Sequence, residues 1–539
     1  VVEPQSAGIG GGGFMMIHMA GTGETVIIDS RETAPAGATP DMFVGVPSAS
    51  QQGVAVGVPG MVRGTELALQ RYGTRSLRQV LKPAIVLADE GFAATPRYAE
   101  VSCSARARNS PEAEAFFCPG GVPPQVGQII RNPDLARTLE LIARHGADCF
   151  YKMMPAKGCT IAKGIVEGQK WDRPQAPNGK GGSMTLADLE AYTAAIRTPI
   201  EGSYRGYVVK SMPPPSSGAL TVIQMLKMLE RFPIGDSSAG WGFGALNTVN
   251  AMADAMRIAF ADRAVWMADD DFVPVPSKGL LDPTYVGLRA QLIVPGTRAP
   301  NEVVVAGDPR PFDVAGTRPG RLLAIADPEV GPGGSTTHFS VVDRWGNMVS
   351  YTNTIESSHG IGVFAGYTDD AGQRVGFGFL LNNELTDFNT NPATSVNPFT
   401  GGPGFNDVEP GKRPRSSMAP TMLFSPDGQP LVAYGSPGGA TIINSVLNIT
   451  LNLVDHGMTL QEAVDAPRVS AASTTGAVSL EEGFPDTLVQ AMQALGYATN
   501  RAVVGSVQAV LVDPRTGRQY GAADDRREGT VITLPRRRN

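Results

Sequence analysis

A hydroxyl residue at the start of a predicted strand is the first candidate for chemistry in this sequence. Gly333 and Gly334 precede Ser335, Thr336 and a β-branched, alternating run that continues to Asp343. A threonine hydroxyl can be activated by the amine of its own residue, but that amine is free only if the chain is cut before it. The pattern therefore suggests cleavage between Ser335 and Thr336. Taken alone, the segment favours an ordinary β-hairpin strand, because strands rich in Thr and Val are common.

Further polar clusters lie next to predicted turns. Arg31 follows a predicted strand and precedes Pro35, so its guanidinium could clamp an anion, although taken alone a surface ion pair is the simpler interpretation. Each of the later clusters also fits turn chemistry, helix capping or surface charge. Together they supply what acyl transfer requires: backbone N–H groups for an oxyanion, and groups that hold a substrate near a nucleophile. These clusters are Thr354 to Glu356, Asn382 to Asp387, Lys412 to Met418 and Gly435 to Gly439.

Two motifs suggest a cofactor or a metal, but both are weak. Gly8 to Gly13 satisfies Gly-x-Gly-x-x-Gly, yet a dinucleotide loop needs a strand before it and a helix after it. Here a proline precedes the glycines and a strand follows, so we expect a backbone passage that feeds a hairpin. The run Asp269-Asp270-Asp271 lacks the spaced oxygens and the glycine of a calcium loop, which predicts a solvated acidic turn. We expect no cofactor and no metal.

The bulk composition excludes several classes of function. A chain of 539 residues can bury a large core, and a formal net charge of −6 gives no electrostatic reason to expect nucleic acid. No run of about 18 apolar residues predicts a membrane span. The chain starts at Val1 without the pattern of a signal peptide, so such a peptide has been removed or was never present. The four cysteines lack zinc-ligand spacing, and their pairing and redox compartment stay open: Cys103, Cys118, Cys149 and Cys159.

Hydrophobic periodicity predicts the elements that position these groups. Strands followed by helices in both halves indicate a layered α+β fold rather than βαβ repeats. Residues 103–124 are expected to be irregular and residues 267–335 rich in loops. Predicted helices cover 61–72, 77–90, 132–145, 186–192, 219–229, 246–266, 442–455, 460–464 and 485–495. Predicted strands cover 14–19, 25–29, 207–212, 337–342, 348–354, 376–382, 421–424, 431–434, 506–512 and 519–522.

The motifs, taken together and in this order, resemble the γ-glutamyltranspeptidase family of the N-terminal nucleophile hydrolase superfamily. The similarity runs essentially from end to end. It implies a four-layer αββα sandwich, with a large subunit of residues 1–335 and a small subunit of residues 336–539 intertwined in a single domain and cut from one precursor. The motifs are Gly8 to Phe14, Asp29 to Pro35, Thr336 to Asp343, Asn382 to Phe388, Lys412 to Pro420 and Gly435 to Gly439.

The resemblance also implies roles by position. Thr336 matches the residue that both cuts the chain and acts as nucleophile, and Thr354 matches the threonine that hydrogen-bonds it. Gly438 and Gly439 match the oxyanion-hole pair. The loop at 389–411 has the length of the family's lid, with Phe399 as its gating aromatic. The donor-binding set comprises Arg31 with Ser416 and Ser417 for the α-carboxylate, and Glu356, Glu384 and Asp387 for the α-ammonium.

The implied activity is transfer or hydrolysis of γ-glutamyl groups from glutathione and related small molecules, through a γ-glutamyl-Thr336 ester, to water or an amine acceptor. The family implies the periplasm or the exterior. It also implies a further helical stretch before Val1, and residues 359–367 form a longer insertion than the family pattern predicts. Two alternatives stay open: a glutaryl-7-aminocephalosporanic acid acylase on the same fold, and an uncleaved, inactive binding protein.

Overall fold

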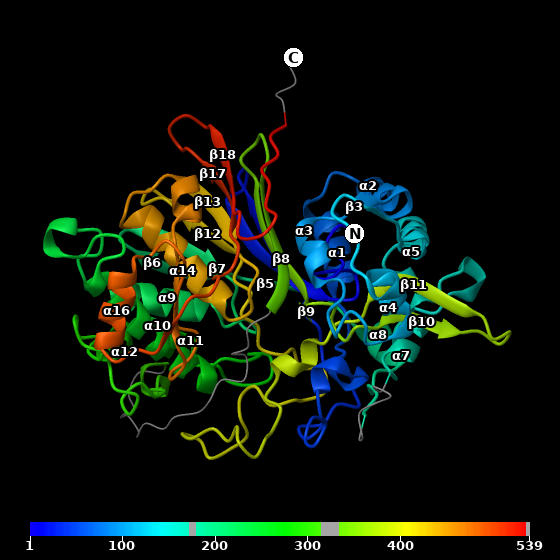
Figure 1. Ribbon diagram of the computed structural model, residues 1–539, viewed down its shortest axis with the longest axis horizontal. Coiled ribbons are helices and arrows are strands. Elements are labelled where there is room, and N and C mark those ends of the chain that lie inside the picture. The colour runs from blue at the N-terminus through cyan, green and yellow to red at the C-terminus, as the bar shows by residue number, and fades with distance from the viewer. Residues whose placement is uncertain (172–178, 314–333, 535–539) are drawn as a thin grey trace.

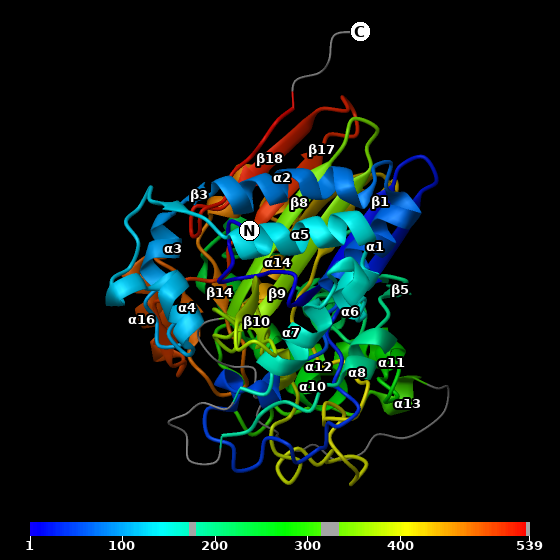
Figure 2. The ribbon, with the colours of Figure 1, turned by 90° about the vertical axis from the view of Figure 1, so that its right-hand side faces the viewer.

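The computed structural model describes residues 1–171, 179–313 and 334–534. Two β-sheets lie face to face in the middle of the molecule, and helices cover the outer side of each sheet (Figure 1, Figure 2). The fold is thus a four-layer αββα sandwich of the α+β class, as the sequence predicts. Of the glycines before Ser335, Gly333 lies outside the described residues.

The first sheet combines strands from both halves of the chain. Its order is β5-β2-β1-β9-β8, so the two predicted hairpins pair with each other through β1 and β9. All pairs are antiparallel, and Thr336 of β8 lies opposite Thr354 of β9. The bounds are β1 Gly12–Met19, β2 Glu24–Asp29, β5 Ala195–Arg197, β8 Gly334–Val342 and β9 Met348–Ser357.

The second sheet also joins early and late segments, in the order β18-β17-β13-β12-β7-β6. Its edge strand β6 has no counterpart among the predicted strands, because it is half exposed and contains Gly202, which weakens the strand pattern. Strand β8 of the first sheet packs on β13 and β17 of the second. The bounds are β6 Ile200–Tyr204, β7 Tyr207–Ser211, β12 Thr421–Phe424, β13 Pro430–Gly435, β17 Gln508–Val512 and β18 Gln519–Ala523.

The long helices lie where the periodicity predicts them. On the first side α1 packs on β2, and α2 pairs with α5; on the second side α9 packs on β6 and β7, with α10 and α14 against it (Figure 1). No helix in the described part of the chain has the length and apolarity needed to cross a membrane. The bounds are α1 Met61–Tyr72, α2 Leu77–Glu90, α5 Pro133–His145, α9 Gly218–Leu229, α10 Leu246–Trp266 and α14 Thr441–Val454.

Shorter elements fill the periphery. Of these, α8, β11, α15 and α16 lie in predicted segments. The other helices among them were missed because a helix of one or two turns shows too little periodicity. The segment expected to be irregular contains α4, which starts at a proline after the N-cap Ser110. These elements are β3 Phe92–Ala93, α3 Pro96–Val101, α4 Pro111–Phe117, β4 Ile129–Ile130, α6 Asp148–Tyr151, α7 Ile161–Gly168, α8 Leu186–Ala191, α11 Ser277–Leu281, α12 Pro283–Ala290, α13 Arg310–Asp313, β10 Phe364–Thr368, β11 Arg374–Leu380, α15 Leu460–Asp465, β14 Val469–Ser470, β15 Val478–Leu480, α16 Asp486–Ala494 and β16 Thr499–Asn500.

The largest hydrophobic core lies between the two sheets and continues among α9, α10 and α14. Phe14 and Met16 of β1 are fully buried in this core together with Leu423, Val432 and Tyr434 of the second sheet. Helix α10 is buried on nearly all sides. A helix buried on all sides carries apolar and small residues all round rather than on one stripe, which explains its recurring Ala and Met.

The glycine run at residues 8–13 has a steric function. A Cβ on Gly11 would lie 2.0 Å from the carbonyl oxygen of Thr354, and one on Gly12 would lie 2.4 Å from that of Ser30. Only glycine allows the backbone to approach so closely. The run therefore leads into β1 beside β9, and this close packing explains the glycines of the motif.

The four cysteines form two disulfides, Cys103–Cys118 and Cys149–Cys159. The sequence left this pairing open. The first bond encloses α4 and closes a loop with a sequence separation of 15 residues.

Loss of this first disulfide should destabilise the protein. In the chain-entropy model, closing a loop of about 15 residues contributes about 3 kcal/mol to the free energy of unfolding. The double variant Cys103→Ser/Cys118→Ser should therefore melt at a lower temperature by scanning calorimetry, and thiol titration of the denatured, unreduced wild type should detect no free cysteine. Titration of thiols in that sample, or an unchanged melting temperature, would contradict the pairing.

Candidate active site

Two threonine hydroxyls face each other at the end of the β8–β9 pair. The Thr336 hydroxyl donates to Thr354 Oγ1 at 3.1 Å, and the Thr354 hydroxyl donates to the carbonyl oxygen of Ser335 at 2.8 Å. All three residues are buried. The strand register produces this arrangement, because Thr336 and Thr354 are directly opposite and a β-bulge between Gly334 and Thr336 turns the preceding peptide toward them.

The residues on both sides of the peptide bond before Thr336 are fixed by further contacts. The Ser335 hydroxyl donates to Ser6 Oγ at 2.9 Å, and Arg527 Nη1 donates to the carbonyl oxygen of Thr336 at 3.1 Å. Burial lowers the pKa of Arg527 to about 10. Neither Ser6 nor Arg527 was singled out from the sequence, because one belongs to the N-terminal segment and the other to the C-terminal one, and no local motif connects them.

The predicted Gly-Gly turn lies between β13 and the start of α14. Gly438 and Gly439 have φ values of 135° and 59°, a region that L side chains rarely adopt. Gly439 lines the same pocket as Thr336. Before the turn, the buried His338 ring lies under Gly435, where a Cβ would meet it at 2.4 Å. The turn thus has the backbone freedom that an oxyanion-binding site requires.

The predicted cation and two of the predicted anions are in direct contact. Arg31 forms ion pairs with Glu384 and Asp387, and it also donates to the carbonyl oxygens of Pro414 and Arg415 at 3.2 and 3.1 Å. The Arg31 and Glu384 side chains are each only 1% exposed. A buried guanidinium with its whole fork occupied is rigidly oriented. The loop after Asn383 thus brings the two carboxylates to an arginine more than 350 residues earlier in the chain.

Glu356 lies beside this cluster in a strained conformation. Its φ is 73°, and its N–H donates to Thr354 Oγ1 at 2.8 Å. Its carboxylate accepts hydrogen bonds from Ser357 and Asn383. Burial, reinforced by Asp387, raises the pKa of Glu356 to about 7. Backbone strain of this kind persists only where surrounding contacts enforce it, and it clusters at functional sites.

Burial also raises the pKa of Glu384 and of Asp387, although Arg31 opposes the rise in both. Several carboxylates around one guanidinium repel one another, and this repulsion adds to burial in favouring their protonated forms. This electrostatic setting suits a ligand that brings a positive charge of its own.

The predicted serines are held by residues that the sequence analysis did not select. The carbonyl oxygen of Ser416 accepts from the Ser217 N–H and hydroxyl, both at 2.8 Å. Arg263 of α10 donates to Ser217 Oγ and Ser417 Oγ, again at 2.8 Å each. The sequence signal was a charged residue within a long helix rich in Ala and Met. Such a residue is almost never fully buried unless it is paired.

Glu32 is a second residue that sequence reasoning missed. It is fully buried next to Arg31, and among the described residues neither of its carboxylate oxygens has a hydrogen-bond partner. Burial raises its pKa to about 8, although Arg31 acts in the opposite direction. The only sequence signal was an acidic residue directly after the candidate arginine, which is common on protein surfaces.

Phe399 is not brought to these groups. It packs on Trp266 with ring centroids 5.0 Å apart, in a small cluster with Phe405, and it is not among the described residues that line the pocket. Phe399, which was expected to gate the site, therefore lies in a separate hydrophobic cluster. Its aromatic ring packs against apolar surface there.

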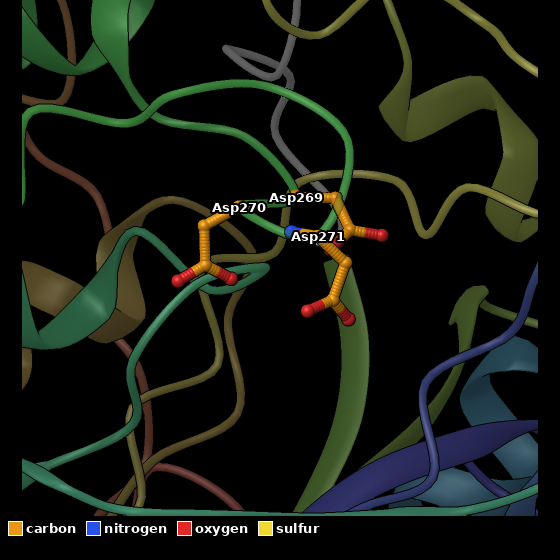
Figure 3. Close-up of side chains that lie close together, drawn as sticks. All are labelled: Asp269, Asp270 and Asp271. Atoms are coloured by element: carbon orange, nitrogen blue, oxygen red, sulfur yellow. Dashed lines mark hydrogen bonds between the residues drawn. The ribbon is translucent and has the colours of Figure 1, made fainter.

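The three consecutive aspartates form an ion-pair network with arginines. Figure 3 shows their carboxylates pointing in different directions, although one oxygen of each lies within 4.8 Å of the others. Arg197 Nη2 pairs with Asp271 Oδ2 at 2.7 Å, and the Arg413 N–H donates to Asp269 Oδ2 at 2.8 Å. Asp269 is buried, so the expectation of a fully solvated turn was wrong for that residue. Arg197 supplies the positive charge that three adjacent carboxylates need.

One pocket of about 620 Å³ unites the threonines, the charged cluster, the serines and the Gly-Gly turn. A pocket of this size accommodates a small organic ligand. Chemically, it offers a hydroxyl next to a polarised carbonyl and backbone N–H groups for a developing oxyanion. It also offers oriented charges for an ionic ligand. These are the requirements of acyl transfer.

The whole chain matches one protein family. The model described as Gamma-glutamyltranspeptidase matches residues 1–534. A glutathione hydrolase proenzyme of Bacillus subtilis (strain 168) is 39% identical over 544 residues, covering 99% of this chain and 85% of that protein. An acylase ACY 1 proenzyme of Pseudomonas sp. (strain V22) is 35% identical over 550 residues, covering 99% and 87%.

Solved structures show the same fold. A cephalosporin acylase from Bacillus halodurans superposes with a TM-score of 0.79 at 24% identity, covering 99% of this chain and 89% of that chain. A γ-glutamyltranspeptidase from Helicobacter pylori gives a TM-score of 0.51 at 39% identity, covering 57% and 85%.

Ionisation of Glu32 should reduce stability as the pH rises. Its pKa of about 8 in the folded protein lies above the ordinary value of 4.5. The folded state therefore keeps a proton that the unfolded state releases, and the free energy of unfolding should fall between these two pH values. Glu32→Gln keeps the shape of the side chain but cannot ionise. In scanning fluorimetry, the melting temperature of this variant minus that of the wild type should therefore increase as the pH rises through this range. The exposed Glu90→Gln is the control. A difference that does not vary with pH would contradict the raised pKa.

Proposed function

Because the chain belongs to the γ-glutamyltranspeptidase family, we propose that it cuts itself before Thr336 and then transfers γ-glutamyl groups from glutathione-like donors to water or to amines. The observation that carries this proposal is the hydroxyl chain from Thr336 through Thr354 to the Ser335 carbonyl. It places a nucleophile and a polarising donor at one peptide bond.

Self-cleavage uses this geometry directly. Thr336 Oγ1 attacks the carbonyl carbon of Ser335, whose oxygen already accepts the Thr354 hydroxyl. The C–N bond breaks, the acyl group passes to Thr336 Oγ1 as an ester, and the amine of Thr336 takes the proton. Water then hydrolyses the ester. The products are a large subunit ending at Ser335 and a small subunit that begins with a free amine and a free hydroxyl on Thr336, the pair that activates an N-terminal threonine.

A γ-glutamyl donor fits the charges of the cluster. Its α-carboxylate binds Arg31 with help from Ser416 and Ser417, and its α-ammonium binds Glu356, Glu384 and Asp387. Arg31 already pairs with Glu384 and Asp387. A zwitterion therefore exchanges these ion pairs for its own without adding net charge to a buried site, which avoids most of the desolvation cost of a lone charge.

The same charges orient the reacting group. With the α-carbon fixed, the γ-carbonyl points to Thr336, whose amine acts as general base for its own hydroxyl. The backbone N–H groups at Gly438 and Gly439 stabilise the oxyanion. The amine half leaves with a proton, and water or a second amine then attacks the γ-glutamyl-Thr336 ester.

Two disulfides among the four cysteines support a location outside the reducing cytosol, which means the periplasm or the exterior.

The runner-up is an acylase that removes a glutaryl group from glutaryl-7-aminocephalosporanic acid. A relative named as an acylase supports this alternative. A glutaryl group lacks the ammonium and would bring a single negative charge beside Glu356, Glu384 and Asp387, which burial and like charges disfavour. Comparing γ-glutamyl-p-nitroanilide with glutaryl-7-aminocephalosporanic acid separates the two, and preference for the second would reverse our choice.

Replacement of Thr336 tests cleavage and catalysis together. Thr336→Ala should leave a single full-length band on a denaturing gel and no turnover of γ-glutamyl-p-nitroanilide, whereas Thr336→Ser should retain part of both because it keeps a hydroxyl. N-terminal sequencing of the smaller wild-type fragment should begin at Thr336. The exposed Thr368→Ala is the matched control. A wild type that stays uncleaved would instead favour an inactive binding protein.

Donor affinity should weaken as the pH falls through the pKa of Glu356. Only the ionised carboxylate attracts an ammonium, and the pKa of Glu356 is about 7. KM for γ-glutamyl-p-nitroanilide should therefore rise below about pH 7, while Glu356→Gln should show a higher KM above that pH and a flatter profile. A KM in the wild type that does not change over this range would exclude this role for Glu356.

A further inference from the structure

The pocket extends beyond the groups that hold the γ-glutamyl donor. One wall comes from two segments of the first half of the chain, and it includes Ser50, Glu100, Ser104 and Arg106. At about 620 Å³ the cavity lies in the range that accommodates a whole small-molecule ligand rather than one side chain. The amine half of the substrate must occupy the part that the donor cluster leaves free.

Arg106 is the cation of this wall. Its Nη1 donates to the carbonyl oxygens of Ser50 and Gly360 at 2.5 and 2.8 Å, and its Nη2 donates to Ser50 Oγ at 3.2 Å. Within the described parts of the chain, these hydrogen bonds all go to neutral oxygens. Burial lowers the pKa of Arg106, and Glu356 only partly offsets this. A half-buried guanidinium with neutral partners gains from an anion more than an exposed one does.

The segment that carries Arg106 is fixed in place. Asn109 Nδ2 donates to the carbonyl oxygens of Gln51 and Ile361 at 2.9 and 2.7 Å, and the Cys103–Cys118 disulfide brackets the segment. Gly362, with a φ of 72°, lets the Arg106 backbone approach, since a Cβ there would lie 2.1 Å from the Arg106 carbonyl oxygen. The guanidinium is therefore pre-organised on the pocket wall, which lowers the entropic cost of binding.

The substrate itself offers a matching anion. When a γ-glutamyl peptide is cleaved, the amine half carries a free carboxylate at its C-terminus, and a peptide or amino acid acceptor carries one too. Arginine binds carboxylates through two parallel hydrogen bonds. We propose that Arg106 binds the carboxylate of the amine half, both in the leaving peptide and in the acceptor, and so selects for peptide over neutral amine partners. This inference rests on the proposed function.

A cycle of substrate and protein changes tests this role. In the wild type, glutathione with its C-terminal carboxylate converted to an amide should lose about tenfold or more in kcat/KM, mainly through KM, which is the range for hydrogen bonds to a charged group. Arg106→Gln should lose a similar factor on glutathione, and amidation should then cost it less than about twofold. Arg106→Lys keeps the charge but not the planar fork. Its kcat/KM on glutathione should lie between those of the wild type and Arg106→Gln.

The exposed Arg108→Gln, two residues along the same segment, is the matched control and should keep the wild-type sensitivity to amidation. If Arg106→Gln lost the same factor in kcat/KM on glutathione, on its amide and on γ-glutamyl-p-nitroanilide, Arg106 would have a purely structural role. That result would overturn this inference and leave the proposed function standing. So would a wild type that is indifferent to amidation, a result that needs no variant. A wild type inactive on all three substrates would overturn the proposed function as well.

Discussion

The pairing of β8 with β9 is the constraint on which the rest of the site depends. A single register places Thr336 opposite Thr354 and directs the Ser335 carbonyl to the Thr354 hydroxyl. A slip of one residue would turn every side chain of the strand to the other face. The hydrophobic core between the sheets prevents such a slip, because the buried residues of both sheets must stay inside. Packing thus sets the chemistry of one peptide bond.

Charge is the second organising feature. Arg31 and the surrounding carboxylates are buried together, an arrangement that is costly unless the charges are matched. The helix α10 takes part through Arg263, which holds the two serine segments, and the C-terminal segment takes part through Arg527. Segments from both halves of the chain therefore line the pocket or hold its lining residues in place. This convergence explains why the two halves of the chain are intertwined rather than separable.

The pocket wall that carries Arg106 is built differently. There a disulfide, an asparagine and a glycine hold Arg106 in place with neutral partners. The cluster around Arg31 holds buried ion pairs, whereas the hydrogen bonds of Arg106 go to neutral oxygens. Both regions line the same pocket as Thr336, and under the proposed function they bind the two halves of the amide substrate.

The sequence by itself determined the long helices, most strands of both sheets, and the polar motifs to which the family resemblance assigns roles. Helices α1, α2 and α10 begin and end where periodicity places them, because their pattern extends over three or more turns. Sequence reasoning missed Glu32, Arg106, Arg263 and Arg527. It also expected Phe399 at the pocket, whereas the Phe399 ring packs on Trp266. Only the tertiary structure decided these positions, because burial and contacts between residues hundreds of positions apart depend on packing, which no local pattern records.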